Sequence, residues 1–214
     1  MIPLMLDLSG RIVRIFGGGE VGARKAAFFG DEAAVQVFSR SFSSCFSTLP
    51  VTSEVLDVEL LDDKALGELI RGAFLVIAAT SAPDQNNRIG RICRELDVLF
   101  NNADGEQGDL LIPAVVTGEH YLIAVSTSGS SPAVARFVRE TIERELPCLD
   151  RMVLLQREVR TALKQLSLSS GERRRILSAI LRDPAVNSAL NTGVDQAAAV
   201  VQVRYLQARF PDGC

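Results

Sequence analysis

The chain has few of the residues that usually build metal centres. It has one histidine, His120, so a histidine-rich metal site within one chain is excluded. Its four cysteines include no CxxC pair, and their spacing does not indicate a zinc site. They are Cys45, Cys93, Cys148 and Cys214. We therefore expect no metal site, with Cys93 in the core and Cys214 as a simple terminal thiol.

The chain also lacks the marks of membrane-spanning, secreted and nucleic-acid-binding proteins. No apolar run approaches the length that spans a bilayer. Segment 1–7 has no basic start and reaches Asp7 early, which makes it a poor signal peptide. The net charge of -3 gives no basic field for nucleic acid, and 47% hydrophobic residues are enough for a substantial core. The sequence thus predicts a cytoplasmic enzyme or binding protein.

A glycine-rich segment is the most informative pattern that is present. The pattern G-x-G-x-x-G is met by Gly17, Gly18, Gly19, Glu20, Val21 and Gly22. An apolar run over 12–16 leads into it, and a helix-like run over 21–29 leads away from it. Strand, glycine turn and helix together predict a dinucleotide site, with the phosphates at the helix N-terminus.

One partner of this pattern is missing. The second strand of such a site usually ends in an acidic residue that holds the ribose hydroxyls. Here it ends at Ser39 and Arg40. Arg40 either favours a 2′-phosphate, and hence NADP, or is a solvated loop residue, so the choice between NAD and NADP stays open.

Strand and helix signals alternate over the first half of the chain. We expect strands over 11–16, 33–38, 54–60, 73–79 and 98–101, and helices over 20–29, 64–70 and 83–96. A serine-rich connection covers 40–50. This alternation predicts an α/β fold with a Rossmann-like, doubly wound parallel sheet.

The pattern changes after the last of these strands. Segments 110–116 and 121–125 predict an antiparallel pair, and 132–146 predicts a helix. Three helices then fit, over 149–166, 171–181 and 193–208, with Pro184 separating the second helix from the third and an ambiguous strand signal over 197–203. We divide the chain into 1–112, 113–148 and a helical domain over 149–214.

Three further segments are candidates for chemistry. Ala79 and Thr80 end a buried strand and should face the same crevice as the glycine loop, although Thr80 is also a good helix cap. Asp104 follows the next strand, where a carboxylate can accept a proton, but spacing alone does not favour it over Asp109, and Asp104 precedes a glycine as turn residues do. A polar loop suits an anion or simply caps the next helix; it contains Ser126, Thr127, Ser128, Gly129 and Ser130.

Together these segments resemble the precorrin-2 dehydrogenase module of siroheme synthases, some of which also insert iron into sirohydrochlorin. The resemblance spans roughly residues 1–148. It rests on Gly17 to Lys25, Ala78 to Thr80, Asn86 to Arg88, Asn101 to Asp104, and Ala124 to Arg136. The helical segment after residue 148 agrees in kind and length only.

The resemblance implies an NAD-dependent oxidation of precorrin-2, a tetrapyrrole with eight carboxylates, to sirohydrochlorin in siroheme biosynthesis. It implies that Asp104 is catalytic, that the loop over 126–130 lies by the tetrapyrrole, and that the chain forms homodimers through 113–148. Arg136 is a candidate for holding substrate carboxylates, as are Arg24, Lys25 and Arg139. The alternative for Arg136 and Arg139 is that they are solvated helix charges. A separate methyltransferase would supply the substrate, because the methyltransferase half of fused siroheme synthases is lacking in this sequence.

Two other functions stay open. The first is sirohydrochlorin ferrochelatase activity, alone or alongside dehydrogenation. The second is a regulatory module that binds NAD and catalyses nothing. Two segments depart from the family pattern, the acidic stretch over 105–109 and the serine- and phenylalanine-rich connection over 40–50.

Overall fold

The computed structural model describes residues 1–207, so Ala208 and Cys214 lie outside the described residues. The chain forms two compact units, Met1–Ile112 and a second unit that begins at Pro113, and each is described by itself. Whether 113–148 is a domain separate from the helices after it stays a prediction. In the described range, no helix is both long and apolar enough to cross a membrane.

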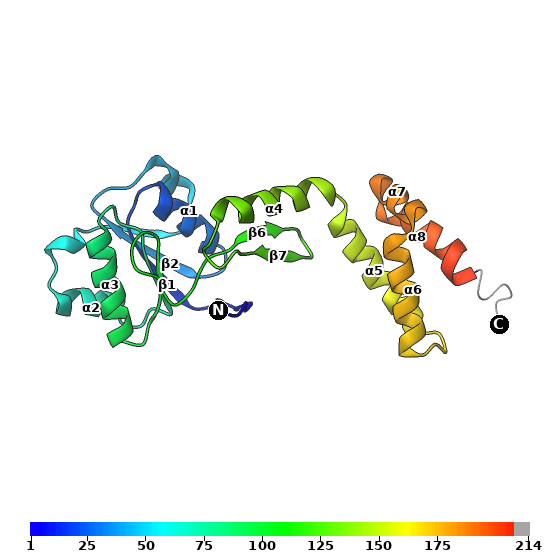
Figure 1. Cartoon of the computed structure of the whole chain (residues 1–214), viewed down its shortest axis with the longest axis horizontal. Coiled ribbons are helices and arrows are strands. Elements are labelled where there is room, and N and C mark those ends of the chain that lie inside the picture. Colours follow the sequence, from blue (N-terminus) through cyan, green and yellow to red (C-terminus); the bar gives the residue numbers. More distant parts are fainter. Residues whose placement is uncertain (208–214) are drawn as a thin grey trace. The chain divides into compact units, whose positions relative to one another are not determined.

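A five-stranded parallel sheet is the centre of the first unit (Figure 1). Its strand order is β3-β2-β1-β4-β5. The strands are β1 (Ile12–Phe16), β2 (Ala34–Ser39), β3 (Thr52–Val55), β4 (Leu75–Ala78) and β5 (Leu99–Asn102). Phe16 at the end of β1 lies opposite Phe38 of β2 and Ala78 of β4. The loops after these strands therefore leave one edge of the sheet together, and β1 is where the chain changes direction across the sheet.

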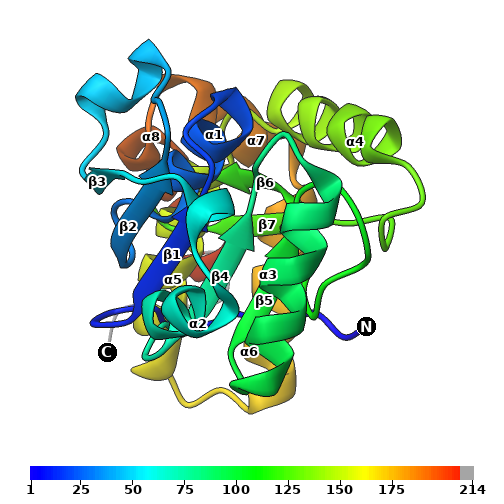
Figure 2. The ribbon, with the colours of Figure 1, turned by 90° about the vertical axis from the view of Figure 1, so that its left-hand side faces the viewer.

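Helices cover both faces of this sheet, as expected for a doubly wound fold (Figure 2). Helix α1 (Glu20–Phe29) packs on one face, where Ile15 and Val37 meet Ala26 and Phe29. Helices α2 (Asp63–Ile70) and α3 (Pro83–Glu95) pack on the other face. The predicted fold class is confirmed.

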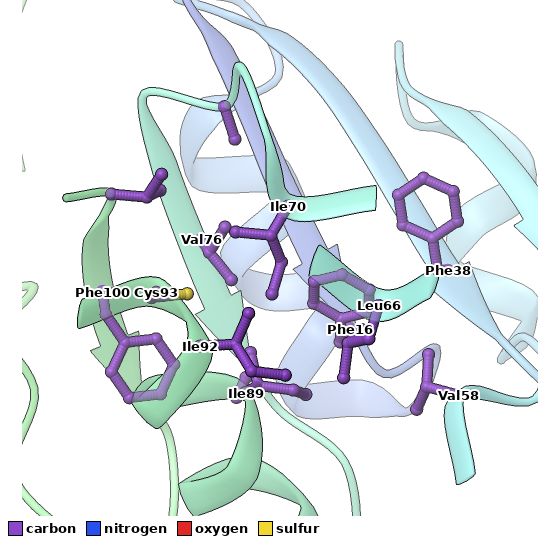
Figure 3. Close-up of a cluster of buried hydrophobic side chains, with 13 residues drawn as sticks. Phe16, Phe38, Val58, Leu66, Ile70, Val76, Ile89, Ile92, Cys93 and Phe100 are labelled. Atoms are coloured by element: carbon purple, nitrogen blue, oxygen red, sulfur yellow. The ribbon is translucent and has the colours of Figure 1, made fainter. Parts of the chain in front are cut away.

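The core under α2 and α3 is shown in Figure 3. Phe16 and Phe38 stack with their ring centroids 5.5 Å apart, and Leu66 and Ile89 are fully buried beside them. Cys93 is buried in the same cluster, as the sequence predicts, and burial raises the pKa of its thiol to about 12. Such a thiol is inert and acts as a small apolar side chain.

Two predicted strands of the first half differ in the structure. The strand expected over 54–60 is instead β3 followed by a 3-10 helix, η2 (Val58–Leu60), because the side chain of Asp57 accepts the N–H of Glu59 and turns the chain. The strand expected from 110 begins only at 114, because Leu110 and Ile112 pack on the core of the first unit. A second 3-10 helix, η1 (Ser44–Thr48), lies within the serine-rich connection.

The second unit begins with the predicted antiparallel pair, β6 (Ala114–Thr117) and β7 (Leu122–Val125). Helix α4 (Pro132–Glu145) packs beside this hairpin. Asp150 joins the hairpin to the next helix, because its carboxylate accepts the N–H groups of Glu119 and His120 at 3.0 and 2.9 Å.

The remaining helices surround a separate apolar core that includes Leu155 and Ile180. They are α5 (Leu149–Lys164), α6 (Ser170–Arg182), α7 (Pro184–Thr192) and α8 (Val194–Val201), followed by a short π-helix, η3 (Gln202–Leu206). The prediction of three helices was wrong because Pro184 starts a helix at its first position, where it leaves no hydrogen bond unmade. The ambiguous segment over 197–203 is helical, because Ala197 and Val201 face this core.

Candidate active site

A cavity of about 670 Å³ opens at the edge of the sheet where the parallel strands end. Segments that follow all five strands line it. The lining includes Gly17, Gly18, Gly19, Glu20, Val21, Ser39, Arg40, Asp57, Glu59, Ala79, Thr80, Ala103 and Asp104. The structure therefore brings the glycine loop, the end of β2, the Thr80 segment and Asp104 to one place.

The glycine loop is pressed against the neighbouring strands. Gly17 has φ +124°, and a Cβ at this position would lie 2.2 Å from the carbonyl oxygen of Ala79. A Cβ on Gly22 would lie 1.9 Å from the carbonyl oxygen of Gly17. Only glycine permits this close turn, so the loop can present its backbone to a ligand.

The N-terminus of α1 is open toward the cavity. Gly19 precedes the helix, and no side chain caps the first N–H groups. Glu20 and Val21 of the first turn are exposed and line the cavity. Uncapped N–H groups and the positive end of the helix dipole suit a pyrophosphate, so the cavity fits a dinucleotide.

Arg40 is engaged by two acidic side chains at the cavity wall. Its guanidinium lies 4.0 Å from the carboxylate of Asp57 and 3.7 Å from that of Glu59. Sequence reasoning missed these two acids because they follow β3, whereas the usual ribose-binding acid follows β2. The signal that could have found them is sheet order, since β3 lies beside β2.

Asn86 connects the end of β4 to the loop that carries Asp104. Its side chain is 0% exposed. Its Oδ1 accepts the backbone N–H of Thr80 at 3.1 Å and the Thr80 hydroxyl at 2.6 Å. Its Nδ2 donates to the carbonyl oxygens of Thr80 and Asp104, both at 3.2 Å. Thr80 therefore organises the site rather than offering a free hydroxyl to a ligand.

A second pair of amides fixes the rest of this loop. Asn102 Nδ2 donates to Asn87 Oδ1 at 3.1 Å and to the carbonyl of Glu106 at 2.8 Å. Asn102 Oδ1 accepts the N–H of Asp104 at 3.2 Å, and Asn87 Oδ1 accepts that of Glu106 at 2.9 Å. The backbone around Asp104 is therefore fixed by the side chains of Asn86, Asn87 and Asn102.

The carboxylate of Asp104 is available for chemistry. Within residues 1–207 it forms no hydrogen bond or ion pair, and its residue lines the cavity. Asp109 differs, because its carboxylate accepts the N–H of Phe100 at 3.0 Å. The structure thus separates two aspartates that spacing left equal, with Asp104 the better candidate for a base.

Lys25 is a partly buried cation on α1. Its ammonium donates to Oδ1 of Asn101 at 2.7 Å, and Asn101 Nδ2 donates to the carbonyl of Leu110. Desolvation, followed by the charge of Arg24, lowers the pKa of Lys25 to about 8. Through this contact Lys25 supports β5, the strand that leads into the Asp104 loop.

The serine-containing loop belongs to the second unit. Ser128 has φ +53°, and its N–H donates to Ser126 Oγ at 3.1 Å. The Thr127 hydroxyl donates to the carbonyl of Ser131 at 2.9 Å, and Ser131 caps α4. The loop is thus self-supporting. Contact of its residues 126–130 with a substrate stays a prediction.

The basic residues on α4 are already paired. Arg136 donates to Glu140 at 2.7 Å, and Arg139 donates to Glu143 at 2.7 Å. A substrate carboxylate would have to compete with these glutamates. Across the described part of the chain, no group of three or more histidine, cysteine, aspartate or glutamate side chains could hold a metal ion.

Comparison with known proteins agrees with this geometry. A family model for NAD(P)-binding domains matches residues 4–114, and one described as sirohaem biosynthesis protein central matches residues 123–145. A precorrin-2 dehydrogenase from Methanosarcina barkeri is 41% identical over 202 residues, which are 92% of this chain and 90% of the relative. The chain belongs to the precorrin-2 dehydrogenase family.

Two further matches are consistent with membership of this family. A siroheme synthase from Neisseria meningitidis is 34% identical over 176 residues, which cover 81% of this chain but only 36% of that protein. The solved structure titled SirC, precorrin-2 dehydrogenase, has a TM-score of 0.70 at 22% identity, covering 95% of this chain and 98% of that one. At this identity the likeness supports the fold, and NAD(P) binding rests on the family model and the cavity.

Proposed function

We propose that this protein oxidises precorrin-2 to sirohydrochlorin in siroheme biosynthesis, with NAD as the acceptor. The observation that carries the proposal is the unpaired carboxylate of Asp104 in the dinucleotide cavity. Bound NAD supplies the hydride acceptor. Precorrin-2 loses a hydride and a proton, so NAD⁺ becomes NADH and one proton is released.

The chain's own residues do the remaining work. The uncapped N-terminus of α1 would bind the pyrophosphate, and Gly17 would let the backbone approach it. Asp104 accepts the leaving proton, and Asn86 holds the loop that carries it. The loop over 126–130 and Arg136 contribute to binding the tetrapyrrole carboxylates.

The acidic wall of the cavity supports NAD over NADP. A dinucleotide with its pyrophosphate at α1 places its adenosine ribose near the end of β2. There Arg40 is already neutralised by Asp57 and Glu59, and the three side chains together carry one negative charge. A 2′-phosphate would meet repulsion there, whereas ribose hydroxyls can donate to the two carboxylates.

We also propose a homodimer formed through 113–148, a cytoplasmic location, and substrate supply by a separate methyltransferase. These proposals rest on family membership and on the sequence. Iron insertion into sirohydrochlorin is a separate activity, and Asp104 could serve both, so a substitution there does not distinguish them.

The test is direct. The protein is incubated with enzymatically made precorrin-2 and NAD, and absorbance follows NADH and sirohydrochlorin. We expect equal amounts of both, and an Asp104→Asn variant slower by about 10²- to 10⁴-fold with unchanged NAD affinity. No NADH with either NAD or NADP would sink the proposal. Adding ferrous iron to sirohydrochlorin then measures chelation separately.

A further inference from the structure

A groove of about 460 Å³ is lined by residues of α5 and α6, wholly within the second unit. Figure 1 shows these two helices. Four cationic side chains line the groove, and none of its lining residues is acidic. The cations are Arg160 and Lys164 on α5, and Arg173 and Arg174 on α6. This concentration of positive charge contrasts with a chain whose net charge is -3.

These cations differ from three arginines on α3 and α4. Arg91, Arg136 and Arg139 each pair with a glutamate four residues later. In contrast, Arg160 is followed four residues later by Lys164, so two like charges share one helix face. Like charges at this spacing destabilise a helix, so an anion in the groove would relieve a repulsion that folding leaves.

The cations are also free to bind an anion. Among the salt bridges within residues 1–207, none involves these four side chains. Arg173 donates to the carbonyl of Leu168 at 3.0 Å, which fixes its guanidinium while leaving its charge uncompensated. Arg160, Lys164 and Arg174 are exposed.

The wall of the groove is apolar. Leu177 and Leu181 line it, and Leu181 is 48% exposed although it is a large aliphatic side chain. A ligand that matches both features has an apolar, extended body and several carboxylates at its rim. A simple inorganic anion would use the charges and leave the leucines uncovered.

We propose that this groove is a binding site for a polycarboxylate tetrapyrrole, separate from the dinucleotide cavity. The choice of tetrapyrrole rests on the proposed function, since substrate and product of that reaction are polycarboxylates of this kind. The groove would hold the carboxylates of one side of the molecule by ion pairs and the macrocycle edge by Leu177 and Leu181. Binding should weaken with rising salt, because exposed ion pairs are screened.

The experiment measures binding of uroporphyrin, a stable octacarboxylate tetrapyrrole, to the full-length protein by fluorescence. The groove variant is Arg160→Gln with Arg174→Gln. The control is Arg157→Gln with Arg175→Gln, which removes the same charge from exposed positions of the same helices outside the groove. We expect a Kd about tenfold higher for the groove variant and within about twofold of wild type for the control.

Several outcomes would overturn the proposal. Equal loss in both variants would mean that uroporphyrin senses only overall charge, and no loss in either would place it elsewhere. Full competition by polyglutamate at matched carboxylate concentration would mean that the groove binds acidic peptide.

NAD affinity and turnover of precorrin-2, measured on the same samples, separate this proposal from the proposed function. If the groove variant keeps both wild-type turnover and wild-type uroporphyrin affinity, the groove proposal is wrong and the dehydrogenase proposal stands. If uroporphyrin binding depends on the groove but no NADH forms, the dehydrogenase proposal is wrong and the groove proposal stands. An unchanged helical circular dichroism spectrum and an unchanged urea unfolding midpoint in the groove variant show that the second unit, which carries the groove, is still folded.

Discussion

At the scale of single residues, Asn86 is one of the side chains that place Asp104. It is fully buried and uses both ends of its amide, so it joins Thr80 to the Asp104 loop. The sequence shows Asn86 only as part of a family motif, because a helical asparagine is usually exposed. Its role depends on two segments, the Thr80 turn just before its own helix and the Asp104 loop, which lies 18 residues further along the chain.

Replacing Asn86 should harm catalysis more than cofactor binding. Asn86→Ala leaves buried groups of Thr80 unpaired and should cost about 1 to 3 kcal/mol of stability. Asn86→Asp keeps the acceptor but loses both donated bonds, so we expect a lower kcat with little change in the KM for NAD. Steady-state kinetics and urea unfolding measure the two effects. Wild-type kcat in Asn86→Asp would show that the loop does not need this bond.

Lys25 should make stability depend on pH. Its pKa is lowered from 10.5 to about 8 in the folded protein, so the folded state loses its proton first. Below pH 8 Lys25 is charged in both states, so the folded state carries the full cost of burying the charge. Between pH 8 and 10.5 the unfolded state binds more protons than the folded state, so the free energy of unfolding rises with pH. Relative to Lys25→Met, the wild-type free energy of unfolding should increase over this window.

Urea unfolding across this pH range is the measurement. Lys64→Met is the control, because Lys64 is an exposed lysine of α2. The comparison of the two variants isolates the pH-dependence that belongs to Lys25. If the Lys25→Met difference from wild type does not change with pH, the ammonium of Lys25 is not held in a desolvated place.

The acids beside Arg40 should set cofactor preference. Asp57→Asn with Glu59→Gln frees Arg40 to bind a 2′-phosphate, so the NADP to NAD ratio of kcat/KM should rise by about tenfold or more. Adding Arg40→Gln to this double variant should cancel the gain. An unchanged ratio in the double variant would mean that the ribose lies away from β2.

At the scale of elements, the first helix is predicted with its observed ends, Glu20 and Phe29. The glycines before it and the apolar spacing within it are local signals, so the sequence is enough. Strands β1, β2, β4 and β5 are also found, because they contain apolar residues that the sheet buries. β3 is exposed along its whole length and begins earlier in the chain than the predicted strand. The observed strand ends differ most from the predicted ones at two places. At one the side chain of Asp57 turns the chain, and at the other Leu110 packs on the core.

The helical module is the least predictable from sequence. Pro184 looks like a break, but Asp183 caps the next helix by accepting the N–H of Ala185 at 2.8 Å. Asp183 also accepts bonds from Arg204 and Tyr205, which lie 21 and 22 residues further on. The aspartate is thus buried by partners that no local window contains.

The start of α6 gives a prediction about one element. Ser169 accepts the N–H of Glu172, and the Glu172 carboxylate accepts the N–H of Ser169, which together form a capping box. Ser169→Ala should lower the free energy of unfolding by about 1 kcal/mol. Ser167→Ala, in the exposed turn before it, should change stability little. Thermal or urea unfolding compares them, and equal effects would contradict the importance of the cap.

At the scale of the whole molecule, the cavity and its supports lie within the first unit. Every lining residue precedes position 105, and two apolar cores of this unit contain only residues up to 112. The loop at 126–130 and the basic groove lie in the second unit. We therefore propose that cofactor binding needs only the first unit, whereas the substrate contacts proposed for the loop over 126–130 need the second.

A fragment of residues 1–112 should bind the cofactor without catalysis. Its cores and its glycine loop are complete, so we expect it to fold and to bind NAD within about tenfold of the full chain. It should form no NADH with precorrin-2. Calorimetry and the absorbance assay measure the two properties. A folded fragment that does not bind NAD would show that the second unit contributes to the cofactor site.

The small β6–β7 hairpin has a consequence for handling the protein. Within residues 1–207 each strand pairs only with the other, so both outer edges present backbone groups without a strand partner. Such edges can recruit strands from other molecules. If an assembly of two chains covers them, a variant engineered to stay single would be prone to aggregate. If dilution or a mutation separates the two chains, their uncovered strand edges would lower solubility before any activity is lost.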